Sequence, residues 1–76
     1  MKLLIVDDHP VMRFGVRQLV VQRWPDAAIG EASCLTQALE QVRAADWELV
    51  VLDLSMPDTS GLEGLVRLHR AAPRTA

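Results

Sequence analysis

One continuous apolar run limits the choice of fold more than any other stretch. Residues 47–54 read WELVVLDL, and positions 49–52 are apolar without a polar residue between them. A strand with one face in water alternates apolar and polar residues, whereas a continuous run rich in β-branched residues indicates a strand covered on both faces. Residues 2–6, KLLIV, show the same pattern. We therefore expect a sheet with helices on both sides.

A first helix is expected between Pro10 and Trp24. Proline is tolerated in the first turn of a helix, and Pro25 stops the helix because it cannot continue the hydrogen-bond ladder. Apolar residues recur near helical spacing in between. Phe14 and Val21 lie off the main stripe, and either packing or a face offered to a partner could explain them; packing is the interpretation we favour. The stripe itself consists of Met12, Val16, Leu19 and Val20.

The rest of the chain continues the alternation. Residues 27–32 form a weaker strand, and Ser33 is a plausible N-cap for a helix with an apolar stripe from Leu35 to Ala45. After the strand at 47–54, residues 55–61 are dense in turn formers, and 61–73 read as a third helix. Strands that alternate with helices predict right-handed βαβ units and one parallel sheet.

Composition excludes several classes of protein. The 76 residues are half hydrophobic with a formal net charge of −2, which is typical of a globular domain and too apolar for disorder. No segment approaches the roughly 20 apolar residues of a membrane helix, and the N-terminus does not resemble a signal peptide, so we expect a cytoplasmic protein. Scattered basic residues argue against nucleic-acid binding by this segment.

Three aspartates follow the two apolar strands. Asp7 and Asp8 come directly after residues 2–6, and Asp53 stands near the end of the third strand. If the strand order is 2-1-3, these strands are neighbours roughly 5 Å apart, and their carboxyl ends meet at the switch point where such sheets bind ligands. A solvated turn is the plainer interpretation of the acid pair, and Asp53 in the neighbouring strand weakens it.

Clustered carboxylates repel one another when ionised, so the site calls for a counter-charge. Mg²⁺ prefers oxygen ligands, uses one or two carboxylates and keeps waters that a phosphate can replace. A carboxylate beside such a cation can act as a nucleophile toward a phosphoryl group and form an aspartyl phosphate.

These motifs resemble the receiver domain of bacterial two-component response regulators. The similarity covers the whole chain and rests on LLIVDDHP, on LVVLDLSMPDTSG and on the alternating pattern; DDHP followed by VMRFGVRQLV is most similar to LuxR/NarL-type transcriptional regulators. The resemblance implies a flavodoxin-like (CheY-like) doubly wound parallel sheet with strand order 2-1-3. It also implies a signalling phospho-acceptor, not an enzyme, which takes its phosphoryl group from the phosphohistidine of a sensor histidine kinase.

The resemblance also assigns roles to individual residues. Asp53 matches the phospho-accepting aspartate, Asp8 the direct Mg²⁺ ligand, and Asp7 the acidic neighbour that reaches the metal through water. Ser55 matches the position that supplies a backbone carbonyl to the metal. His9 could suggest metal binding, but we interpret it as a polar residue at the mouth of the crevice.

The family's strands four and five carry a hydroxyl and a lysine that pair with the phosphoryl group, and neither strand occurs in these 76 residues. We therefore expect residues 1–76 to be a partial receiver domain without a DNA-binding domain. One alternative is a truncated, non-switching module that binds a kinase or another receiver, with a homo-oligomer through the exposed edge of the third strand. A Mg²⁺-dependent phosphohydrolase ranks lower, because Ser55 stands where its general acid is needed. Dinucleotide binding is weaker still, since no G-x-G-x-x-G follows the first strand.

Overall fold

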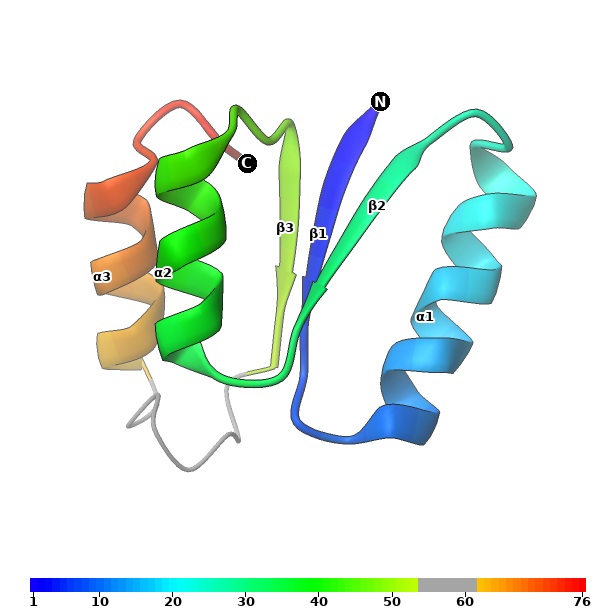
Figure 1. The fold of residues 1–76 in the computed structure, drawn as a ribbon, viewed down its shortest axis with the longest axis horizontal. Coiled ribbons are helices and arrows are strands. Elements are labelled where there is room, and N and C mark those ends of the chain that lie inside the picture. Colours follow the sequence, from blue (N-terminus) through cyan, green and yellow to red (C-terminus); the bar gives the residue numbers. More distant parts are fainter. Residues whose placement is uncertain (54–61) are drawn as a thin grey trace.

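The computed structural model describes residues 1–53 and 62–76 and shows a parallel sheet with helices on both faces (Figure 1). Its elements are β1 (Lys2–Val6), α1 (Pro10–Arg23), β2 (Ala28–Ala32), α2 (Leu35–Ala44), β3 (Leu49–Leu52) and α3 (Leu62–Ala71). The sheet order β2-β1-β3 confirms the predicted arrangement. Within the described ranges, no helix is both long enough and apolar enough to span a membrane.

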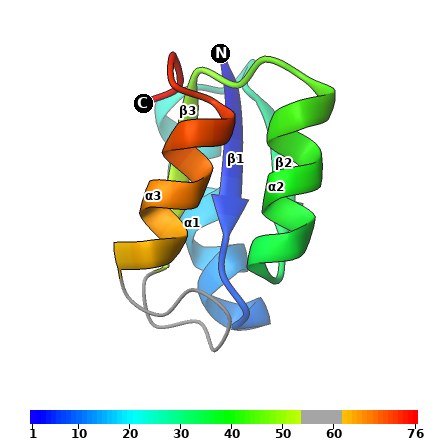
Figure 2. The ribbon, with the colours of Figure 1, turned by 90° about the vertical axis from the view of Figure 1, so that its left-hand side faces the viewer.

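β1 is the central strand, and it pairs in parallel along both edges. Val6 lies opposite Ala32 of β2 and opposite Leu52 of β3. α1 covers one face of the sheet, whereas α2 and α3 lie on the other face (Figures 1 and 2). The continuous apolar run at residues 2–6 predicted a strand covered on both sides, and this prediction is confirmed.

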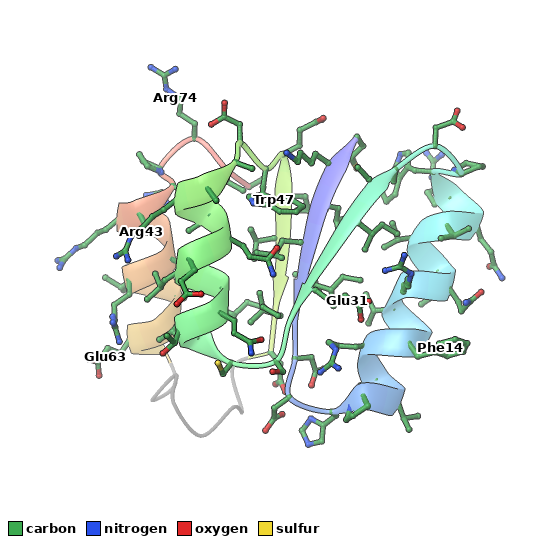
Figure 3. The ribbon with its side chains drawn as sticks, in the orientation of Figure 1. Phe14, Glu31, Arg43, Trp47, Glu63 and Arg74 are labelled. Carbon is green, nitrogen blue, oxygen red and sulfur yellow. The ribbon has the colours of Figure 1, made fainter. Side chains whose placement is uncertain are left out.

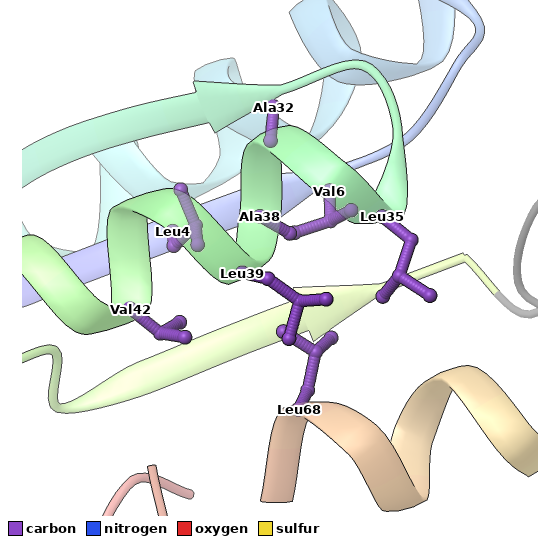
Figure 4. Close-up of a cluster of buried hydrophobic side chains, with 8 residues drawn as sticks. All are labelled: Leu4, Val6, Ala32, Leu35, Ala38, Leu39, Val42 and Leu68. Atoms are coloured by element: carbon purple, nitrogen blue, oxygen red, sulfur yellow. The ribbon is translucent and has the colours of Figure 1, made fainter. Parts of the chain in front are cut away.

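Alternate residues of β1 face two separate cores, because successive side chains of a strand point to opposite faces. On the α1 side, Leu3 and Ile5 pack with Val20. The larger core lies between the sheet and the other two helices (Figure 4). Its buried members are Leu4, Val6, Ala32, Leu35, Ala38, Leu39, Val42 and Leu68. The strand that precedes the acid pair is therefore anchored from both sides.

The apolar stripe of α1 is narrower than the sequence predicted. Val20 is buried and Val16 packs against the α1-side core, but Met12 and Leu19 are 58% and 66% exposed. Phe14 is 62% exposed and points away from the sheet, so it does not pack within the described residues (Figure 3). In the described part of the chain, α1 is the one helix on this face, so side chains at its flanks meet solvent instead of a neighbour.

The N-cap of α2 is Cys34, so the prediction for Ser33 is wrong. The backbone N–H and the hydroxyl of Ser33 both donate to Oε1 of Gln37, at 2.8 and 2.9 Å. The hydroxyl thus donates to a side chain in the first turn of the helix. The first turn is instead tied back by Gln37, much as the glutamine of a capping box would do.

β3 is shorter than predicted, and its outer edge is partly paired. The strand spans Leu49–Leu52, and Trp47 lies outside it. On the edge away from β1, the N–H of Ala76 donates to the carbonyl of Glu48 at 3.2 Å and the N–H of Val50 donates to the carbonyl of Ala76 at 2.8 Å. This is the hydrogen-bond pattern of a parallel pair, so the edge that the sequence left exposed is engaged at one position.

Candidate metal centre

The backbone of two aspartates is fixed at the carboxyl edge of the sheet. Asp7 directly follows β1, and its N–H donates to the carbonyl of Ala32 in β2 at 3.0 Å. Asp53 directly follows β3, and its N–H donates to the carbonyl of Val6 in β1 at 2.9 Å. The ladder thus continues one residue past each strand, and the register places Asp7 and Asp53 side by side.

Four side chains converge at this edge: Asp7, Asp8, His9 and Asp53. One ligand atom from each lies within 4.8 Å of the others. Asp7 is buried, and the side chains of Asp8 and Asp53 are 31% and 22% exposed. The strand order therefore brings together the three carboxylates that the sequence singled out, whereas Ser55 lies outside the described residues.

His9 takes a more central place than the sequence suggested. Its Nδ1 lies 2.9 Å from Oδ1 of Asp7, 2.9 Å from Oδ1 of Asp8 and 3.6 Å from Oδ2 of Asp53. The hydrogen bond to Asp7, followed by the charge of Asp8, raises the pKa of the imidazole above its ordinary value of 6.5. Our interpretation of a residue at the crevice mouth missed these contacts, and the only sequence signal was adjacency to the acid pair.

The backbone between β1 and α1 holds these groups in place. Oδ1 of Asp7 accepts the backbone N–H of His9 at 2.9 Å, which is the local turn that aspartate favours. From the first turns of α1, Nη1 of Arg13 donates to the carbonyl of Asp7 at 2.7 Å, and its Nε lies 3.3 Å from Oε1 of Glu31 in β2. Figure 3 shows Glu31 directed toward α1. Arg13 thus connects the acid pair, α1 and β2, a role that residue spacing does not reveal.

The cluster borders a hollow of about 310 Å³ between α1 and β3. Apolar side chains, including Ile5, Val16 and Val51, line the part that lies away from the acids, whereas Asp7 and Asp53 line the part near them. An apolar wall beside charged groups limits their access to water, and charge interactions are stronger where water is limited. The hollow therefore favours a compact counter-charge at the carboxylates.

The donor set fits a divalent cation. Carboxylate oxygens are the ligands that hard cations such as Mg²⁺ prefer. Among the described residues, Oδ1 of Asp8 is buried yet has no hydrogen-bond partner of acceptable geometry, although Nδ1 of His9 lies within 2.9 Å. A buried oxygen without a hydrogen bond carries a desolvation cost that a bound cation would remove. Asp7, Asp8 and Asp53 are the residues that would hold the cation.

Characterised proteins of similar sequence include bacterial response regulators. The chain is 42% identical over 67 residues to the nitrate/nitrite response regulator protein NarL of Escherichia coli K12. The aligned region covers 88% of this chain and 31% of NarL. The chain is also 35% identical over 69 residues to the response regulator UvrY of the same strain, covering 91% of this chain and 32% of UvrY. The chain thus spans about a third of the length of these relatives.

Solved structures show the same fold. The isolated REC domain of RcsB from Salmonella enterica serovar Typhimurium, with the phosphomimetic BeF₃⁻, superposes with a TM-score of 0.85 at 26% identity, covering 100% of this chain and 57% of that one. The response regulator protein TrrA, solved in complex with the histidine kinase ThkA, is also similar: the match to this structure has a TM-score of 0.83 at 27% identity and covers 97% of this chain and 62% of that one. Residues 3–76 match the response regulator receiver domain family, and the chain belongs to this family of signalling domains, among relatives of the LuxR type.

Proposed function

We propose that this chain is the phospho-accepting receiver segment of a LuxR-type transcriptional response regulator, with Asp53 as the acceptor. The convergence of Asp7, Asp8 and Asp53 within 4.8 Å is the observation that carries the proposal. The phosphomimetic in the RcsB structure and the kinase complex of TrrA support it, because both belong to similar domains. With a net charge of −2, this segment is not proposed to contact DNA.

In the proposed reaction, a carboxylate oxygen of Asp53 attacks the phosphorus of a phosphohistidine on a sensor histidine kinase. The P–N bond breaks, the imidazole leaves with the bonding electrons, and an acyl phosphate forms on Asp53. Asp8 and Asp53 would hold Mg²⁺ directly and Asp7 would reach it through water, and Ser55 is proposed to add its backbone carbonyl. A bound Mg²⁺ supplies neutralisation of the phosphoryl charge. The ladder bonds of Asp7 and Asp53 keep the acceptor and the cation ligands in a fixed relation.

The test uses the chain with Mg²⁺ and acetyl phosphate. Intact-mass spectrometry is expected to show addition of one phosphoryl group, stable in acid and labile in base, and absent when Mg²⁺ is removed with a chelator. Asp53→Asn is expected to abolish the adduct. Asp26→Asn, which changes an exposed aspartate before β2, serves as the matched control and is expected to leave the adduct intact. An adduct that persists in Asp53→Asn contradicts the assignment.

A second candidate function is a non-switching interaction module that forms homo-oligomers through the outer edge of β3. The observation that favours it is the partial pairing of that edge, where among the described residues the backbone-to-backbone hydrogen bonds are those with Ala76. All four residues of β3 are only half-buried, so further apolar surface is available. Light scattering over a dilution series is expected to show an average molecular mass that decreases as the chain is diluted. A mass that stays monomeric at every concentration contradicts this candidate.

A further inference from the structure

We propose that His9 is a ligand at the carboxylate cluster and that its nitrogen raises the affinity of the site for divalent transition-metal ions such as Co²⁺ relative to Mg²⁺. This inference rests on the proposed cation site of Asp7, Asp8 and Asp53. It goes beyond that site because the sequence assigned ligand roles to oxygen donors alone, and a nitrogen donor changes which cations the site favours.

The first argument is the position of the imidazole. Nδ1 of His9 points into the cluster, at 2.9 Å from oxygens of both Asp7 and Asp8 and 3.6 Å from an oxygen of Asp53. Around a cation with bonds of about 2.1 Å, adjacent ligand atoms at right angles lie about 3.0 Å apart. The separations of Nδ1 from the oxygens of Asp7 and Asp8 are therefore close to those of neighbouring ligands on one ion.

The second argument is that one buried oxygen of the cluster, Oδ1 of Asp8, lacks a hydrogen-bond donor among the residues described. Nδ1 carries at most one proton, and a strong hydrogen bond requires a nearly linear geometry, so this proton cannot serve Asp7 and Asp8 equally. The hydrogen bond goes to Asp7, and in the described part of the chain the buried Oδ1 of Asp8 is left without a hydrogen bond. A cation in place of the proton can contact both oxygens and the nitrogen together.

The third argument is that local structure holds the ring near this position. His9 is the N-cap of α1, directly before Pro10, whose ring restricts the backbone at this point. Its backbone N–H donates to Oδ1 of Asp7 at 2.9 Å, and its carbonyl accepts the N–H of Arg13 at 3.0 Å. The backbone of His9 is thus held at both its N–H and its carbonyl, so the imidazole needs little ordering when a cation binds.

The mixed donor set predicts a particular order of affinities. Imidazole nitrogen is a good ligand for borderline transition metals and a poor one for Mg²⁺, which retains oxygen ligands and water. The affinity of the chain for Co²⁺ is therefore expected to depend on His9, whereas the affinity for Mg²⁺ is expected to depend on the carboxylates alone. Substitution of a residue that only hydrogen-bonds to a metal ligand already lowers metal affinity about 10- to 100-fold. Loss of the ligand His9 is therefore expected to weaken Co²⁺ binding by at least about this factor.

Isothermal titration calorimetry of the 76-residue chain with Co²⁺ and with Mg²⁺ tests this order. His9→Ala is expected to weaken Co²⁺ binding by that factor and to leave Mg²⁺ binding little changed. His9→Asn keeps a favourable N-cap residue while removing the imidazole and is expected to behave in the same way. His69→Ala, which removes the other histidine, exposed on α3, is the matched control and is expected to bind both cations as the parent chain does.

A spectroscopic readout requires no substitution. In the chain loaded with Mn²⁺, electron spin-echo modulation is expected to show nitrogen coupled directly to the metal, and ¹⁵N-labelled histidine is expected to change that coupling. Absence of nitrogen coupling, together with equal Co²⁺ affinity in the parent chain and His9→Ala, overturns the inference while leaving the Mg²⁺ site and phosphorylation of Asp53 intact. Nitrogen coupling without any phosphoryl adduct supports the inference and contradicts the proposed function instead. Failure of every cation to bind overturns both.

Discussion

Substitution of Gly30 by alanine tests the packing between β2 and the residues that precede β3. A Cβ placed on Gly30 would collide with the indole of Trp47 and would lie 3.0 Å from Oε1 of Gln41. Neither neighbour is free to withdraw. The indole N–H donates to the carbonyl of Gln41 at 2.8 Å, and Nε2 of Gln41 donates to the carbonyl of Glu31 at 2.6 Å.

The expected cost follows from these contacts. Overpacking a filled site costs about 1–3 kcal/mol, and loss of one of the two hydrogen bonds adds about 0.5–1.5 kcal/mol. A chain of this length has a total free energy of unfolding of about 4–11 kcal/mol, so Gly30→Ala is expected to remove a large part of it. Gly15→Ala is a control that is expected to change the free energy of unfolding in the opposite direction. Gly15 is exposed in the interior of α1 with no atom within 4 Å of an added Cβ, and Gly15→Ala is expected to stabilise by about 1 kcal/mol.

Urea unfolding and thermal unfolding, both followed by far-ultraviolet circular dichroism, measure the free energies of unfolding and the melting temperatures without relying on tryptophan emission. Gly15→Ala is expected to raise the melting temperature by about 4–8 °C, and Gly30→Ala to lower it by more. In a Trp47→Leu background, where the colliding ring is absent, the cost of Gly30→Ala is expected to shrink by about 1 kcal/mol or more. Equal costs in both backgrounds, or stabilisation by both alanines, refute the packing argument.

Three further outcomes follow from the geometry. Because the pKa of His9 is raised in the folded chain, protonated His9 stabilises the fold below about pH 6.5, and this stabilisation is lost as the pH rises through the raised pKa. Thermal melts in the presence of a chelator should show the melting temperature falling over this pH range. His9→Asn should make the melting temperature less dependent on pH. Leu4→Ala empties a fully buried position and is expected to cost about 2–5 kcal/mol in urea unfolding, enough to abolish a cooperative transition if stability is at the low end. Arg13→Ala breaks the bond to the Asp7 carbonyl and is expected to cost about 0.5–1.5 kcal/mol, more than Arg17→Ala, which removes an exposed ion pair.

The fold was predictable because its main signals are local. The continuous runs at 2–6 and 49–52 predict the two neighbouring strands β1 and β3, and prolines mark where α1 begins and where it stops. What the sequence could not predict depends on neighbours. The exposure of Met12 and Leu19 depends on what else covers that face of the sheet, and a helical repeat does not contain this information.

At the site, too, local sequence signals were predictive and features that depend on neighbouring elements were not. The carboxylates could be placed together because each follows a strand and the strand order determines which ends are adjacent. The inward position of His9 depends on the turn between β1 and α1, and the link from Arg13 to the Asp7 carbonyl depends on how α1 crosses the sheet. Both are consequences of side-chain direction and helix placement, which residue spacing does not specify.

The central position of β1 has a consequence for the dynamics of the site. Its amides are enclosed by two ladders and two cores, so they are expected to exchange with deuterium only in the rarest, global openings. β3 has one complete ladder and a single pair with Ala76 on its other edge, and it is expected to open locally far more often. Asp7 therefore belongs to the slowest-opening part of the chain and Asp53 to a faster one. A cation held by both would link the two, and the protection it adds should appear at the amides of β3 rather than at those of β1.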